Sequence, residues 1–357
     1  MSLLAERPTT TFTAPPDAFA PAPAEARGLA RDAVRLLVAG PDGVEHARFR
    51  DLPAHLRAGD LLVVNNSATV AGQLDAHLRG AGAGRPVVLH VGTLLPGGDR
   101  VVELRTAPDA ARAVLDAERG QRVRVGRGAE VELLAAYPRD GSSPTGHGNR
   151  LWRAGVTGDL DAALRRHGRP ISYGYLDRSY GLDDYQSVFS TVPGSAEMPS
   201  AGRPFTPGLV TRLVAGGVAV APITLHTGFS SQEAGEAPQP EWYDVPDATA
   251  RAVASTRAAG GRVVAVGTTV TRALESAVDP TGAVRPSSGW TERVVTPAEP
   301  PAVVDGLVTG WHDPGASHLL LVEAVAGPAV TQAAYDAAST SGYLWHEFGD
   351  AGLLMRG

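Results

Sequence analysis

The chain of 357 residues contains no cysteine and no lysine. The absence of cysteine excludes disulfide bonds, thiolate nucleophiles and zinc–thiolate sites. The absence of lysine excludes a Schiff-base nucleophile and a phosphate-binding loop of the Walker type, because both need the lysine amine. All 32 basic side chains are therefore arginine, a usage typical of GC-rich genomes.

Long apolar runs and targeting signals are also missing. No run approaches the roughly 18 residues of a membrane helix, and residues 1–16 lack the basic start and apolar stretch of a secretory signal. We therefore expect a cytoplasmic protein without a membrane partner. The ten histidines are scattered and form no His-x-x-x-His pair beside a glutamate, so we expect no metal site.

The net charge of −6 bears on nucleic-acid binding, which usually shows as a basic surface. An acidic total lowers the expectation of an RNA partner but leaves local arginine patches open. Two groups are candidates for RNA contact or are simply solvated surface residues: Arg119, Arg122, Arg124 and Arg127, and Arg165, Arg166 and Arg169.

Strands and helices alternate over most of the chain. Strands are predicted at 34–40, 60–65, 218–225 and 262–266, helices at 207–215, 247–259, 270–277 and 331–339, and further apolar segments at 303–308 and 318–325. Such alternation is typical of an α/β fold built on a mainly parallel sheet or barrel. We predict a discontinuous, barrel-like large α/β catalytic domain made of residues 1–74 and 154–357.

The intervening segment, residues 75–153, has a different pattern. Short β-type runs at 86–91, 101–105, 122–125 and 129–135 are separated by glycine-rich turns, with one helix expected at 108–118. We predict that this segment is a smaller, inserted β-barrel domain.

Two motifs place polar residues directly after β-branched runs. Thr227 and Gly228 follow His226 at the end of strand 218–225, and Thr268 and Thr269 follow strand 262–266. Ligands bind at the carboxyl ends of strands in α/β folds, so these motifs predict one built site. His226 is a general base, a ligand holder or a structural histidine.

The segment that opens with Thr268 and Thr269 has the features of a helix N-terminus that binds an anion such as a carboxylate, or of an ordinary threonine cap. Arg272 and Glu275 lie three residues apart on the same helix face and predict a local ion pair.

A polar cluster of Asp183, Asp184, Tyr185 and Gln186, with Arg178 upstream, suits ribose hydroxyls or marks a helix start. The loop of residues 194–205 is rich in glycine, proline and serine, and we expect it to close over a ligand.

The order and the amino-acid sequences of these motifs resemble those of one family, the S-adenosylmethionine:tRNA ribosyltransferase-isomerases of queuosine synthesis. The resemblance includes Gly59-Asp60-Leu61-Leu62-Val63-Val64-Asn65-Asn66 upstream, and residues 303–309 and 348–350 downstream. It implies that S-adenosylmethionine donates its ribosyl unit to 7-aminomethyl-7-deazaguanine in tRNA. Adenine and methionine leave, the sugar becomes an epoxycyclopentane, and the chemistry needs neither metal nor lysine.

The resemblance also implies which residues act. The residues expected to act in catalysis are His226, Glu241, Asp350 and Tyr185. The first three are the candidates for proton transfer, and which of them is the base and which the acid stays open. The residues expected to bind S-adenosylmethionine, by family match or as polar neighbours of the motifs, are Asn65, Asn66, Arg178, Gln186, Ser200, Gly202, Thr227, Gly228, Thr268, Thr269, Arg272 and His312.

Several positions depart from the family pattern. Ala68 stands where the family usually has arginine, and Arg203-Pro204 replaces a Leu-His pair. The Ser-Tyr-Gly-Asp ending becomes His346-Glu347-Phe348-Gly349-Asp350. These changes keep two alternatives open: the same donor chemistry with a small-molecule or internal acceptor, and a non-catalytic S-adenosylmethionine- or RNA-binding protein. We expect a monomer or small homo-oligomer.

Overall fold

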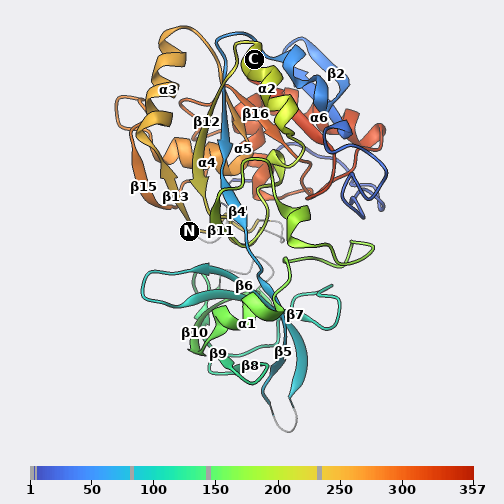
Figure 1. Cartoon of the computed structure of the whole chain (residues 1–357), viewed down its shortest axis with the longest axis vertical. Coiled ribbons are helices and arrows are strands. Elements are labelled where there is room, and N and C mark those ends of the chain that lie inside the picture. The colour runs from blue at the N-terminus through green and yellow to red at the C-terminus, as the bar shows by residue number, and fades with distance from the viewer. Residues whose placement is uncertain (1–3, 5, 81–83, 142–145, 231–234) are drawn as a thin grey trace.

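The computed structural model describes residue 4 and residues 6–80, 84–141, 146–230 and 235–357. It has two parts, a helix-covered sheet above and a β-barrel below in Figure 1. The small parallel pair β4 (Ser67–Thr69) and β11 (Val192–Ser195) lies between them.

The large sheet has nine strands. Their order is β15 (Ser287–Thr291), β13 (Glu241–Val245), β12 (Ala219–Leu225), β3 (Leu61–Asn65), β14 (Val263–Val266), β16 (Gly306–Thr309), β17 (Ala351–Met355), β1 (Arg35–Gly40) and β2 (Gly43–Arg48). β12, β3, β14 and β16 are parallel to one another. β3 and β14 are buried at every position, as expected of strands covered on both faces.

Alternate side chains of the central strands enter two different cores. Leu61 and Val63 pack toward α3 (Asp247–Ala258), α4 (Thr268–Ser276), α5 (Ser317–Ala326) and α6 (Pro328–Thr340). Leu62 and Val64 pack toward α2 (Pro207–Ala215) and the 3₁₀ helix η2 (Phe49–His55). The sheet is therefore the middle layer of three, and its strand ends are left to carry a site.

The barrel closes in the order β10 (Leu151–Gly158), β7 (Arg100–Thr106), β6 (Arg85–Leu94), β5 (Gln73–Leu78), β8 (Arg122–Val125) and β9 (Ala129–Ala136). Its interior is filled by apolar residues, and α1 (Leu160–His167) packs beside β5 and β9. The predicted α/β class with a smaller inserted β-barrel is confirmed. The division into domains at residues 74 and 153 stays a prediction.

Some sequence-based expectations are corrected. Four strand pairs of the large sheet are antiparallel: β15–β13, β13–β12, β16–β17 and β1–β2. The sheet ends at β15 and β2 instead of closing like a barrel. The apolar segment 318–325, for which the sequence predicted no element type, belongs to helix α5 (Ser317–Ala326). Among the described residues, no helix is long and apolar enough to cross a membrane.

The helix predicted at 108–118 is absent from the structure, which shows an irregular segment there. Arg105 of β7 donates hydrogen bonds to the carbonyl oxygens of Ala110 and Ala111, and Val114 pairs with Leu104 through its backbone. Val114 and Ala117 fill the barrel core. Tertiary contacts thus take the backbone groups that a helix would use.

Candidate active site

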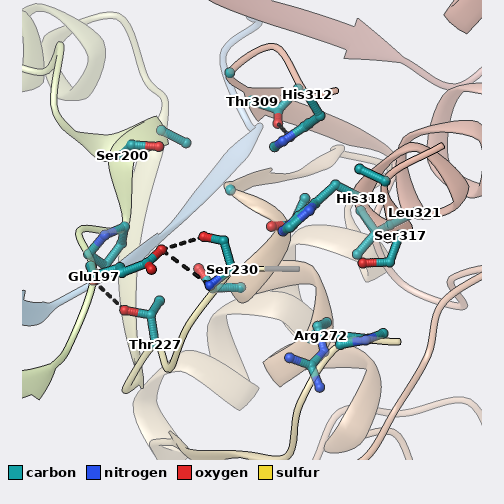
Figure 2. A pocket seen from close by; sticks show the side chains of 18 of the residues that line it. Glu197, Ser200, Thr227, Ser230, Arg272, Thr309, His312, Ser317, His318 and Leu321 are labelled. Atoms are coloured by element: carbon teal, nitrogen blue, oxygen red, sulfur yellow. Dashed lines mark hydrogen bonds between the residues drawn. The ribbon is translucent and has the colours of Figure 1, made fainter. Parts of the chain in front are cut away.

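A cavity of about 180 Å³ lies where the loops that follow the parallel strands meet. β12 leads into Thr227 and Gly228, β14 into the start of α4, and β16 into the loop that carries His312. Figure 2 shows Glu197 and Thr227 on one side of this cavity and Arg272 and His318 on the other.

Eight of the predicted site residues line this cavity. They are Ser200, Thr227, Gly228, Glu241, Thr268, Thr269, Arg272 and His312. The predicted loop of residues 194–205 contributes Ser200 and its neighbours to the wall. The sequence motifs therefore come together at the expected end of the sheet.

Glu241 and Arg272 form an ion pair at the cavity wall. The other carboxylate oxygen of Glu241 accepts a hydrogen bond from the backbone N–H of Gly228 at 2.9 Å, and Arg272 also donates to the carbonyl oxygen of Gln239 at 2.9 Å. Burial raises the pKa of Glu241, although the charge of Arg272 opposes this, and burial lowers the pKa of Arg272. Each charge is thus balanced by the other.

The predicted ion pair between Arg272 and Glu275 is replaced by this contact. Glu275 instead accepts hydrogen bonds from the backbone N–H groups of Ala302, Val303 and Val304, at 2.7, 3.0 and 3.3 Å. Its carboxylate therefore holds the segment that leads into β16.

The N-terminus of α4 opens on the cavity through Gly267, Thr268 and Thr269. Gly267 has φ of 99°, and no side chain caps the helix there. The unpaired N–H groups of the first turn and the helix dipole favour an anionic ligand group at this point.

Glu197 lies on the wall opposite Arg272 and was not among the predicted site residues. One carboxylate oxygen accepts hydrogen bonds from the N–H and hydroxyl of Ser230 (Figure 2). The other accepts one from the hydroxyl of Tyr173. The hydroxyl of Thr227 donates to the carbonyl oxygen of Glu197. The only feature of the sequence that pointed to Glu197 was its position in the loop predicted to close over a ligand.

Glu347 is a second cavity residue that the sequence prediction missed. Its Oε2 atom is buried and has no hydrogen-bond partner. Burial, together with the charge of Glu197, raises the pKa of Glu347 to about 8. The feature of the sequence that could have pointed to Glu347 is that it lies where this chain differs from the Ser-Tyr-Gly-Asp ending of the family.

Two histidine rings stack on the far wall. The ring centroids of His312 and His318 are 4.5 Å apart with an angle of 8° between the planes, and His312 Nε2 lies 3.1 Å from the Thr309 hydroxyl. Burial and the neighbouring histidines lower the pKa of His312, while burial and the charge of Arg272 lower that of His318 to about 4. Both rings are therefore uncharged at neutral pH.

His226 and Gln186 lie in a separate, open groove of about 1160 Å³ between the barrel and the large sheet. His226 Nδ1 is 2.8 Å from the Ser67 hydroxyl, and the ring stacks on Trp242 with centroids 5.3 Å apart. Burial lowers the pKa of His226. Because Thr227 is the next residue, groove and cavity lie on either side of one short segment.

The remaining predicted residues lie outside the cavity. Asn65 and Asn66 tie neighbouring strands together, through the backbone of Leu225 and the hydroxyl of Thr224. Tyr185 is buried against Phe348, Gly202 is buried beside Ser187, and Arg178 lies over the Tyr180 ring. Asp350 accepts hydrogen bonds from the backbone N–H groups of Arg35 and Leu344 and from Arg35 Nε, at 2.8 to 2.9 Å.

No group of three or more histidine, aspartate or glutamate side chains is placed to hold a metal ion in the part of the chain that the structure describes. The lining instead offers hydroxyls, backbone N–H groups, carboxyls and neutral imidazoles. An α/β sheet with this polar cavity at its strand ends, and a barrel beside it, defines a protein that binds a polar organic ligand.

Comparison with known proteins identifies the family. The profile of the family described as queuosine biosynthesis protein matches residues 9–354, and the chain belongs to this family. It is 35% identical over 336 residues to a protein of Pelotomaculum thermopropionicum, covering 91% of this chain and 94% of that one. It is 36% identical over 357 residues to a protein of Gloeobacter violaceus, covering 97% and 95%. Both are named S-adenosylmethionine:tRNA ribosyltransferase-isomerase.

A solved structure supports the assignment. The crystal structure of an S-adenosylmethionine tRNA ribosyltransferase from Thermotoga maritima is 26% identical and superposes with a TM-score of 0.51, covering 96% of this chain and 99% of that one. The family resemblance predicted from the sequence is thus confirmed.

Proposed function

We propose that this protein is an S-adenosylmethionine:tRNA ribosyltransferase-isomerase. It transfers the ribosyl unit of S-adenosylmethionine to 7-aminomethyl-7-deazaguanine in tRNA and isomerises it, with release of adenine and methionine. The observation that carries the proposal is the match to the family over residues 9–354, together with a polar cavity formed by that family's motifs. A cytoplasmic monomer or small homo-oligomer is part of the proposal.

The cavity is the proposed donor site. The N–H groups at the start of α4, with Thr268 and Thr269, suit the carboxylate of the methionine portion. Ser200, Thr227 and His312 supply hydroxyl and imidazole groups that can bond to the sugar and the base. No metal enters this scheme.

Proton transfer falls to His226 and Glu241 in this proposal. The lowered pKa of His226 keeps its ring neutral at pH 7, so it can accept a proton, and Ser67 fixes its orientation. Glu241 lies at the cavity wall with a raised pKa. Asp350 and Tyr185, which the sequence also put forward, act in this proposal by supporting the surrounding structure.

The open groove is the proposed tRNA site. Arg100, Arg165 and Arg169 lie along it and can contact phosphates, while Trp242 and Trp290 offer flat surfaces for unstacked bases. His226 lies in this groove, and the next residue, Thr227, lines the cavity. In this proposal a tRNA base that is flipped into the groove therefore comes next to the donor site.

One observation favours a second candidate function. Ala68, which stands where the family usually has arginine, lines the same groove. A groove that lacks this charge suits a small-molecule or internal acceptor for the same donor chemistry.

The test is chromatography of the protein incubated with S-adenosylmethionine, with and without tRNA that carries the aminomethyl base. Release of adenine and methionine only in the presence of that tRNA supports the proposal. Adenine released without tRNA supports the second candidate. Binding of S-adenosylmethionine without any adenine release supports the reading as a binding protein.

A further inference from the structure

The cavity wall contains two carboxyl groups that no basic side chain balances. Within the described residues, neither Glu197 nor Glu347 forms an ion pair with an arginine or histidine. The other two carboxyls of the wall do have basic neighbours: Glu241 is paired with Arg272, and Asp313 lies 3.4 Å from His346 Nε2. Burying carboxyl groups near one another without a cation is unfavourable. A ligand that brings a positive charge removes this penalty.

Glu197 is held in place before any ligand arrives. The side chain is 7% exposed, and its carboxylate accepts bonds from Ser230 and Tyr173, which come from separate segments of the chain. Tyr173 in turn stacks against Arg105 of the barrel, with the guanidinium 4.8 Å from the ring centroid. The carboxylate thus has one fixed position.

Glu347 complements this arrangement. Its Oε2 atom lacks a partner, and the hydroxyls of Tyr175 and Tyr185 are the other titratable groups nearby. The remaining titratable side chains of the lining are His346, which lies 3.4 Å from Asp313, the paired Glu241 and Arg272, and the stacked His312 and His318. None of these is paired with Glu347, because Arg272 is engaged by Glu241, His346 faces Asp313, and the two stacked rings are neutral.

We propose that Glu197 and Glu347 form a subsite for a cationic group of the ligand, and that Glu347 releases its proton to solvent when that group binds. The reaction is the loss of one proton from a carboxylic acid, and no other bond changes. The inference rests on the proposed function, in which the ligand is S-adenosylmethionine. That molecule carries two cations, the sulfonium and the α-ammonium.

Isothermal titration calorimetry at pH 7.5 in two buffers of different ionisation enthalpy tests the subsite. Since the pKa of Glu347 is about 8, wild-type protein should release roughly 0.75 proton per S-adenosylmethionine bound. E347Q should lose most of this release and bind on the order of tenfold more weakly, as for the loss of one charge-assisted contact. E323Q is the matched control, because Glu323 is a buried carboxyl bonded to Thr9 and Thr10 outside the cavity.

The neutral thioether S-adenosylhomocysteine distinguishes the two cations. Proton release with S-adenosylmethionine alone assigns the sulfonium to the subsite, and release with both ligands assigns the α-ammonium. Either result supports the subsite. Should E347Q fold less well, E197Q provides the second variant, with the same loss of binding expected.

Equal affinity and equal proton release in wild type and E347Q would overturn the subsite. If adenine release with tRNA persists in that case, the proposed function stands without it. If wild-type protein binds no S-adenosylmethionine, the proposed function fails and the subsite fails with it.

Discussion

The carboxyl of Glu347 makes the stability of the protein depend on pH. Its pKa is about 8 in the folded protein against 4.5 for an ordinary glutamate, so the folded state holds a proton that the unfolded chain loses first. Stability from this group is present below pH 4.5 and is lost as the pH rises to about 8. E347Q should therefore gain stability relative to wild type between pH 5 and 8 and hold a constant advantage above that. Urea midpoints at several pH values measure this, and parallel curves would contradict it.

His226 is the residue whose chemical role is most directly testable. H226A should slow adenine release by roughly 10²- to 10⁴-fold, as expected for loss of a general base. S-adenosylmethionine affinity should change little, because the cavity residues proposed to hold the donor are unchanged. Single-turnover kinetics and calorimetry separate the two effects. H77A, on the outer face of β5, is the control. Unchanged adenine release in H226A would remove it as the base.

The first turn of α4 is the element that the proposed donor site depends on most. A Cβ at Gly267 would keep φ near 99°, which L-residues rarely adopt, and would lie 3.4 Å from Ala201. G267A should lower stability by about 1–3 kcal/mol and weaken S-adenosylmethionine binding. G208A, in open space at the start of α2, should not lower stability. Thermal denaturation and calorimetry measure both, and a G267A protein that matches wild type in both would contradict the assignment.

Elements set by local signals were predictable, and those set by distant contacts were not. α2 has the bounds that the sequence predicts. Its start is set by local signals, because Thr206 caps the helix and Pro207 occupies its first position. The helix predicted at residues 108–118 was wrong because Arg105 donates hydrogen bonds to carbonyl oxygens of that segment. The cavity residues that belong to the sequence motifs were predictable, because each follows directly after a strand that the sequence also predicts. Glu197 and Glu347 were missed because their meeting depends on packing between segments 150 residues apart in the chain.

At the scale of the whole molecule, one buried carboxylate joins the barrel to the large sheet. Glu103 of β7 accepts bonds from Arg105 and Arg150 at 2.8 and 3.3 Å and lies 3.2 Å from His90 Nδ1. Arg150 also reaches the carbonyl oxygen of Ser230, next to the cavity. Burial opposes ionisation, but His90 and the two arginines lower the pKa of Glu103 to about 2.

E103Q should destabilise the protein by about 3–5 kcal/mol at pH 7, because it removes the buried carboxylate that Arg105 and Arg150 share and leaves Arg150 with Glu236 as its carboxylate partner. The group stabilises the fold above pH 4.5, and this contribution is lost as the pH falls toward 2, so the gap between wild type and E103Q should narrow over that range. Urea denaturation from pH 7 to pH 3 measures the gap. E132Q, on the outer barrel surface, should change little. A constant gap would contradict the assignment.

The barrel leaves and rejoins the large part of the molecule at a single point. The backbones of Gln73 and Arg169 bond to each other in both directions, at 2.9 and 3.0 Å. Paired strand residues of this kind lie about 5.5 Å apart at their Cα atoms. A short turn can therefore bridge the gap once the insert is cut out. Because the two chain ends of the barrel meet, its strands and loops can vary in length without moving the strand ends that carry the cavity.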